Sequence, residues 1–217
     1  KEESTPIRPC SDGTRSARPK DPSFNDLTLK GGSGNSLAKV YLNIRAHACI
    51  GATDLSSAYH QIRLTKLEGS LRRVWLPISK STKRISWGSN ESDIQWVEYH
   101  WTSASFGDIV ANALLSCVIS EAANRFGKRK PLAQKWVQEL SYVDDLFCGH
   151  QDPRVRDQLM EDITSILSES GWKHCPWYTM DIPEEMPSIP PTESELLQAK
   201  KLLGYYHLAS SDLFVLK

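Results

Sequence analysis

The stretch Leu140-Ser141-Tyr142-Val143-Asp144-Asp145-Leu146-Phe147-Cys148-Gly149 carries the clearest signal in the sequence. Two adjacent aspartates lie at a turn between two short apolar runs rich in strand-forming residues, which predicts a hairpin. Carboxylates beside apolar strands are costly unless they are paired or bind a cation. Adjacent carboxylates also repel each other, and a divalent metal relieves that repulsion. The stretch therefore predicts a metal-binding turn, with an ordinary solvated turn as the alternative.

A third carboxylate, Asp54, lies 90 residues before Asp144. It follows the short apolar run 48–53, which predicts a buried strand, and precedes residues that commonly cap helices. An isolated aspartate in this position is most often a helix cap. If the strand before Asp54 pairs with the strand after Asp145, however, three carboxylates converge at one end of a sheet. Such oxygen ligands suit Mg²⁺, and two ions would support phosphoryl transfer.

The rest of the chain mixes segments of helical and of strand-like pattern. The expected helices cover residues 37–44, 109–126, 132–140 (helical or extended), 153–171 and a short segment after the capping box at 192–195. The expected strands are 72–76, 84–87 and 94–101, which together form a hairpin, and 202–208 with 213–216, which form a terminal hairpin. This order predicts an α+β fold with an antiparallel sheet packed on helices rather than a regular βαβ alternation.

The charge is balanced overall but not along the chain. The 26 Lys and Arg residues equal the 26 Asp and Glu residues, yet residues 1–90 carry 15 basic and 7 acidic side chains, against 11 and 19 in residues 91–217. This asymmetry indicates a polyanionic partner, although compositional drift explains it equally well. Five cysteines without a C-x-x-C pair argue against a zinc ribbon and a secreted disulfide scaffold. No run approaches 18 apolar residues, so no membrane span is expected.

Two motifs resemble those of a known enzyme family. Tyr142-Val143-Asp144-Asp145 resembles the Y-x-D-D signature of reverse transcriptases, and residues 53–62 resemble the first catalytic motif of that family in LTR retroelements. Residues 23–26 with 29–31 are similar to the "SLND…LLKG" stretch of Pao/BEL-type retrotransposons. Weaker similarities follow in the expected order: Arg8–Asp12 to the R-x-x-x-D strand of the fingers, Phe106-Gly107 to the second motif, Gly171-Trp172-Lys173 to the fourth motif, and Leu203-Gly204-Tyr205 to the primer-grip hairpin.

The resemblance implies a right-hand polymerase palm with partial fingers. Residues 1–47 would be partial fingers, 48–70 the palm segment with the first catalytic motif, 71–105 a fingers hairpin, and 106–217 the palm through the primer-grip hairpin. No thumb or RNase H segment is expected within these residues. We therefore expect a fragment of a retroelement polyprotein that also contains protease, RNase H and integrase.

The resemblance also implies the site residues. Asp54, Asp144 and Asp145 would be catalytic and hold two Mg²⁺ ions, with Mn²⁺ as a substitute and the backbone of Leu55 as a further candidate ligand. Tyr59 would be a steric gate that excludes the ribose 2′-OH. The expected nucleotide-binding residues are Arg8, Tyr59, Phe106 and Gly107, and the expected primer or template contacts are Tyr142, Val143, Lys173, Leu203, Gly204 and Tyr205.

The implied function is synthesis of DNA on an RNA or DNA template, in which a primer 3′-OH attacks a dNTP. Two departures from the family pattern leave alternatives open. The second motif lacks the usual Pro or Gln after Gly107, and Asp108 puts a negative charge near the incoming phosphates. The alternatives are an inactive reverse-transcriptase-like scaffold that binds nucleic acid and a decayed retroelement fragment. A third alternative is a palm-type nucleotidyl cyclase, although the Tyr59 gate argues against its ribonucleotide substrate. We expect an intracellular location, in a cytoplasmic particle or the nucleus, and no secretion.

Overall fold

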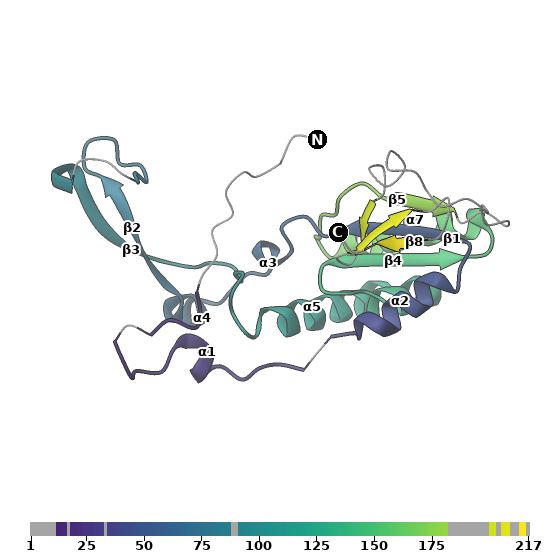
Figure 1. Cartoon of the computed structure of the whole chain (residues 1–217), viewed down its shortest axis with the longest axis horizontal. Helices are drawn as coiled ribbons and strands as arrows, with labels where there is room; N and C mark the ends of the chain where they lie inside the picture. Colours follow the sequence, from purple (N-terminus) through teal and green to yellow (C-terminus); the bar gives the residue numbers. More distant parts are fainter. Residues whose placement is uncertain are drawn as a thin grey trace. The chain divides into compact units, whose positions relative to one another are not determined.

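The computed structural model describes residues 12–16, 18–32, 34–87, 91–181, 200–202, 205–208 and 213–215. The chain forms two compact units. The hairpin unit comprises residues 1–29 and 59–111, and the sheet unit comprises residues 30–58 and 112–217. Figure 1 shows the helices and strands along the chain, many of them labelled.

A three-stranded antiparallel sheet forms the centre of the sheet unit. Its middle strand is β1 (Cys49–Asp54), flanked by β4 (Asp145–His150) and β5 (Tyr178–Asp181). The first five residues of β1 are buried and only Asp54 is exposed, because the strand is covered on both faces until its last residue. At Gly51 a Cβ atom would lie 2.7 Å from Met160 Sδ, so this position has no room for a side chain. The expected strand over 48–53 is confirmed.

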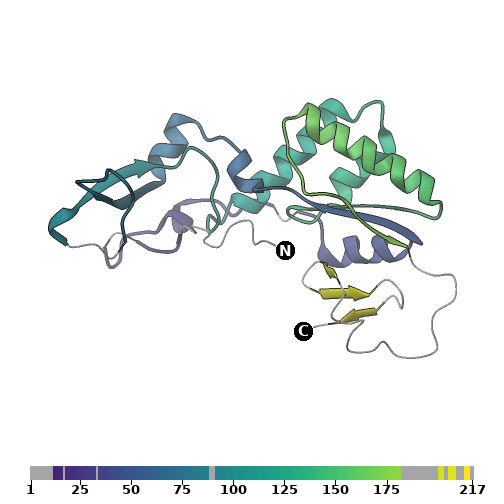
Figure 2. The same cartoon turned by 90° about the horizontal axis from the view of Figure 1, so that it is seen from above.

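Helices pack on this sheet and close its core. They are α2 (Leu37–Arg45), α5 (Ala111–Phe126), α6 (Pro131–Glu139) and α7 (Pro153–Glu169). Figure 2 shows α7 and α2 on opposite faces of the sheet, and both helices contact its strands. Many of the largest fully buried side chains come from α2, β1, α5, β4 and α7: Ile44, Ile50, Leu115, Ile119, Leu146, Phe147, Ile163, Ile166 and Leu167. The four helices confirm the expected helical segments, and residues 132–140 are helical rather than extended.

The ends of α7 follow the sequence signals. The Asp152 side chain accepts a hydrogen bond from the Arg154 N–H at 2.8 Å, and Pro153 occupies the first helical position, where its missing N–H has no cost. At the other end Gly171 adopts a left-handed φ of +83°, which stops the helix. The predicted start and stop are therefore confirmed.

The strand β5 was not expected from the sequence. Its four residues, Tyr178–Asp181, are too few to show a strand periodicity. Arg156, 5% exposed on α7, holds this strand through an ion pair of 2.7 Å with Asp181 and also donates to the Ile50 carbonyl at 3.3 Å. A tertiary ion pair thus positions a strand that local sequence does not reveal.

In the hairpin unit, β2 (Arg73–Ser79) and β3 (Ile94–His100) pair in antiparallel register from Arg73 with His100 to Ser79 with Ile94. The short helices α1 (Phe24–Leu27), α3 (Ala58–Gln61) and α4 (Lys66–Leu71) and the 3₁₀ turn η1 (Glu91–Asp93) surround this hairpin in sequence. The hairpin prediction is confirmed, but residues 84–87 do not form the expected strand. They contribute one isolated bridge, Ile78 with Ile85, rather than a continuous ladder.

Three strands close the described part of the chain. They are β6 (Lys200–Leu202), β7 (Tyr205–Leu208) and β8 (Leu213–Val215), in the order β6-β7-β8. The terminal hairpin of β7 with β8 is confirmed, whereas the expected single strand over 202–208 is divided between β6 and β7, which pair with each other. The helix expected after residues 192–195 lies outside the described residues.

The structure confirms the coarse class, a mixed fold of helices and antiparallel sheets. Among the described helices, none combines the length and apolar character that crossing a bilayer requires.

Candidate active site

The three aspartates meet at one end of the β1–β4 pair. The antiparallel register places Asp54 directly opposite Asp145, at the last pair of the ladder. The Leu55 N–H then donates to the Asp144 carbonyl at 2.9 Å, so the backbones remain in contact beyond the ladder. The pairing of these two strands, which the convergence of the three carboxylates requires, is therefore confirmed.

The Asp144-Asp145 turn is tighter than the sequence indicated. Tyr142 and Asp145 exchange two backbone hydrogen bonds of 2.9 Å, and Val143 adopts φ +54°. This is the pattern of a two-residue turn in which the first central residue is normally glycine. A β-branched residue there stores strain of about 1–3 kcal/mol, and such strain gathers at functional sites. The run before the aspartates contributes this single bridge and not the expected strand, because the turn closes immediately.

Burial and the neighbouring charges both disfavour the charged form of Asp145 at this end of the sheet. Burial raises the pKa of Asp145 from 3.8 to about 7, and the neighbouring Asp144 and Asp54 charges add to that rise. Asp54 is exposed, whereas Asp144 and Asp145 are half-buried. Within the residues that the structure describes, no three His, Cys, Asp or Glu side chains are arranged to hold a metal ion as they stand. With a pKa of about 7, Asp145 is partly protonated at neutral pH in the absence of a cation.

The segment 173–175 borders the aspartate motif along the other edge of β1. The Lys173 carbonyl accepts from the Ser56 N–H at 3.0 Å, and the Cys175 N–H donates to the Asp54 carbonyl at 2.8 Å. The Thr53 hydroxyl also donates to the Cys175 carbonyl at 2.7 Å. The structure thus brings Lys173, an expected primer or template contact, beside the residues that follow Asp54.

The expected nucleotide-binding residues of the hairpin unit also meet. The Tyr59 side chain is buried, and its ring contacts the Phe106 ring edge to face, with centroids 4.6 Å apart. Gly107 follows with φ +96°, a conformation that favours glycine. Three further expected site residues, Arg8, Leu203 and Gly204, lie outside the described residues, and Tyr205 begins β7.

Asp108 does not present a free negative charge, contrary to the sequence expectation. Its carboxylate, 4% exposed, pairs with Arg72 Nε at 2.7 Å, and the Arg72 side chain is only 10% exposed. The Arg72 guanidinium also lies 4.7 Å from the centre of the Phe24 ring. A buried guanidinium therefore neutralises the carboxylate, and the two residues lie 36 positions apart, too far for a sequence pattern to reveal.

Sequence reasoning assigned no role to Asn25, yet its side chain binds the turn that follows Phe106. Asn25 Nδ2 donates to the Gly107 carbonyl at 3.1 Å, and Asn25 Oδ1 accepts from the Ile109 N–H at 2.9 Å. One local signal was available, because Ser23 and Asp26 form a capping box that fixes α1 around Asn25. The partners of its side chain, Gly107 and Ile109, are more than 80 residues away and could not be predicted from the local sequence.

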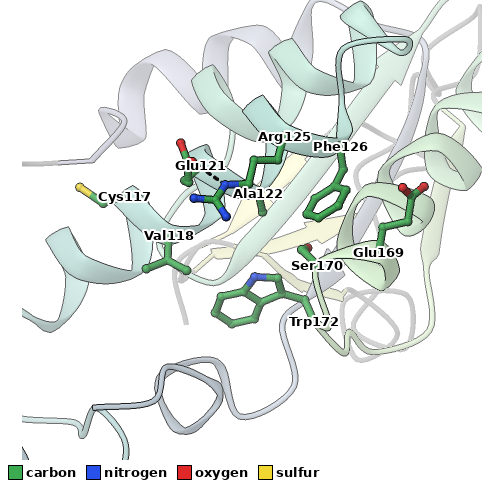
Figure 3. Close-up of a pocket in the computed structure, with 9 residues that line it drawn as sticks. All are labelled: Cys117, Val118, Glu121, Ala122, Arg125, Phe126, Glu169, Ser170 and Trp172. Carbon is green, nitrogen blue, oxygen red and sulfur yellow. Dashed lines mark hydrogen bonds and ion pairs between the residues drawn. The ribbon is translucent and has the colours of Figure 1, made fainter. Parts of the chain in front are cut away.

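A cavity of about 570 Å³ lies in the sheet unit between α5 and the end of α7 (Figure 3). Its walls are mostly apolar, and Glu121 and Arg125 form an ion pair at its side. The lining residues are Cys117, Val118, Glu121, Ala122, Arg125, Phe126, Glu169, Ser170 and Trp172. None of the expected site residues lines this cavity, so it shares no residue with the aspartate cluster.

The chain is similar in fold to solved structures of foamy viral protease–reverse transcriptases. The native prototype foamy virus protease–reverse transcriptase matches with a TM-score of 0.46 and 17% identity over 69% of this chain. The foamy viral protease–reverse transcriptase dRH in complex with double-stranded DNA matches with a TM-score of 0.44 and 16% identity over 67% of this chain. This chain spans 17% and 21% of the length of those two chains.

No curated protein matches the chain in sequence. The family model described as reverse transcriptase (RNA-dependent DNA polymerase) matches residues 13–175, which include all three aspartates of the cluster. Because this match covers well over half of the 217 residues, the chain belongs to the reverse transcriptase family of RNA-dependent DNA polymerases.

Proposed function

We propose that this chain carries out template-directed DNA synthesis, in which a primer 3′-OH attacks the α-phosphate of a dNTP and pyrophosphate leaves. The observation that carries this proposal is the register of β1 with β4, which pairs Asp54 with Asp145. The two motifs lie 90 residues apart in sequence and form one carboxylate cluster in the fold. Membership of the reverse transcriptase family supports the same reaction.

The cluster has the donor chemistry for Mg²⁺, with Mn²⁺ as a substitute. Three carboxylates supply oxygen ligands, and burial together with repulsion from Asp144 and Asp54 raises the pKa of Asp145 to about 7, so a cation would stabilise its charged form. Asp54, Asp144 and Asp145 would hold two ions, with the Leu55 backbone as a further ligand, after their carboxylates turn toward a shared point. When bound, the ions would supply charge stabilisation for the hydroxyl and the departing pyrophosphate.

The remaining site residues would bind and orient the substrates. Tyr59, buried against Phe106, would close the space that a ribose 2′-OH requires. The strained turn at Val143 would present Tyr142 and Val143 to the primer end, and Lys173 would meet the nucleic-acid backbone. The full proposal assigns Arg8, Tyr59, Phe106 and Gly107 to the nucleotide, and Tyr142, Val143, Lys173, Leu203, Gly204 and Tyr205 to the primer and template.

Primer extension on an RNA template, with dNTPs and Mg²⁺, tests the proposal. Asp144→Asn and Asp145→Asn should each lower the extension rate by about 100-fold or more, since each removes a charge from the cluster. Asp162→Asn is the matched control, because Asp162 lies on α7 and faces Lys130 at 3.5 Å. Extension by Asp144→Asn at the wild-type rate would refute the assignment of that carboxylate.

A second candidate is a scaffold that binds template and primer without extending them. The observation that favours it is the second motif, which lacks the usual Pro or Gln after Gly107. Template–primer binding without extension in both Mg²⁺ and Mn²⁺ would select this candidate over the polymerase.

We also propose the biological setting that the motifs indicate, an LTR retrotransposon of the Pao/BEL type. In that setting the chain is part of a polyprotein with protease, RNase H and integrase, and acts inside the cell, in a cytoplasmic particle or the nucleus. The division into palm and fingers belongs to this proposal as well. The reading frame on either side of residues 1 and 217 tests it, because a protease or RNase H motif there is expected.

A further inference from the structure

The Phe106–Ile109 turn of the hairpin unit is held by a side chain from a distant segment. Asn25 bonds the peptide groups on both sides of Asp108, since its amide donates to the Gly107 carbonyl and accepts from the Ile109 N–H. A carboxylate at position 25 could not donate to the carbonyl, and an aliphatic side chain could make neither bond. The two bonds therefore require the asparagine side chain.

Asn25 is itself fixed in place. Its backbone N–H donates to the Gly13 carbonyl at 2.8 Å, and the Ser23–Asp26 capping box orders the short helix around it. A Cβ atom at Gly13 would lie 2.7 Å from Asn25 Oδ1, so the two residues are in close contact. Such a pre-oriented amide loses little freedom when it binds the turn.

The side chain between the two bonds is fixed as well. Asp108 points into the unit and pairs with Arg72 at 2.7 Å, with both side chains almost fully buried. The turn is thus held through its backbone by Asn25 and through its side chain by Arg72. Its position relative to the rest of the hairpin unit depends on both residues.

The turn carries Phe106, whose ring lies against Tyr59 at 4.6 Å and at 76° to it. Because Tyr59 is buried, the side chains packed against it, Phe106 among them, limit how far its ring can shift. We propose that Asn25 is a positioning residue that holds the Phe106–Ile109 turn and thereby sets the Tyr59 ring for discrimination between deoxyribose and ribose. This inference rests on the proposed function, in which Tyr59 is the gate.

Two measurements on the full chain test the inference, with Asn25→Leu as the main variant. In single-nucleotide incorporation, the preference for dNTP over rNTP should fall about tenfold, mainly through a lower KM for rNTP, while kcat for dNTP changes less than about threefold. Hydrogen exchange of the 106–110 backbone should accelerate about tenfold, since two bonds to the turn are lost. Asn43→Leu is the control, because Asn43 bonds only the Lys39 carbonyl within α2 and should change neither quantity.

Gly13→Ala reaches the same contact from the other side and should move both measurements in the same direction, so a folding defect of Asn25→Leu does not leave the inference untested. An unchanged dNTP preference in folded variants, or unchanged exchange of the turn, overturns the inference. Absence of incorporation by the wild-type chain contradicts the proposed function instead. In that case the exchange measurement alone decides whether Asn25 holds the turn.

Discussion

Replacing Asp145 with Asn should stabilise the metal-free protein at neutral and alkaline pH. Burial and the Asp144 and Asp54 charges raise the pKa of Asp145 from 3.8 to about 7 in the folded chain, while the unfolded chain retains the ordinary value. The folded state therefore binds a proton that the unfolded state releases. The stability that protonated Asp145 contributes is fully present below about pH 3.8. It is lost progressively as the pH rises to about 7.

The size of the effect follows from this pKa difference. At about 1.36 kcal/mol for each unit of pKa, a rise from 3.8 to about 7 sets an upper bound of about 4 kcal/mol above pH 7. Asp145 is partly exposed, and solvent screening reduces this bound, so we expect Asp145→Asn to gain about 1–3 kcal/mol at pH 8. At pH 5 the gain should shrink to about 40% of its value at pH 8, for a folded pKa of about 7.

Urea unfolding at pH 5 and pH 8, with a chelator present, measures this gain as a change in the free energy of unfolding. Asp21→Asn is the matched control, because Asp21 is an exposed carboxylate far from the cluster in sequence, and it should change stability by less than about 0.5 kcal/mol. Equal or lower stability of Asp145→Asn at pH 8, with an unchanged urea dependence, would refute the electrostatic reasoning. Added Mg²⁺ should stabilise the wild-type chain more than the variant, because the cation relieves the same repulsion.

The other predictions concern packing, backbone and thiol chemistry. Arg72→Ala should lower the free energy of unfolding by about 3–5 kcal/mol in urea titrations, because it leaves the buried Asp108 carboxylate unpaired, whereas joint replacement of both residues by apolar ones should recover most of that loss. Gly171→Ala should cost about 1 kcal/mol in thermal unfolding, since φ is +83° and no neighbouring atom clashes with a Cβ there; no loss would mean that the helix end can rearrange. Burial raises the pKa of Cys148 to about 12, so in alkylation mapped by mass spectrometry the exposed Cys117 should react before Cys148, and Cys148 only on unfolding; rapid labelling of Cys148 in the folded chain would contradict its burial.

Local sequence was sufficient for the elements with strong periodicity or terminal signals. The α7 helix shows apolar residues on one face, Pro153 at its start and Gly171 at its end, and its bounds agree with the prediction. The strands β1 and β3 were equally visible, because each is a continuous run bounded by turn or capping residues. The prediction missed or misassigned segments whose sequence pattern is weak. The four residues of β5 have no periodicity, and residues 84–87 have strand-forming residues but only one bridging partner.

The sequence by itself determined the helices and strands with clear periodicity, the family motifs and the three aspartates, because these depend on residue type and spacing along the chain. Only the tertiary structure decided that Asp54 faces Asp145, since register depends on two strands 90 residues apart. It also decided that Arg72 neutralises Asp108 and that Asn25 holds the turn at Gly107 and Ile109. Charge pairing and hydrogen bonding act through distances in space, so their partners appear only when the chain has folded.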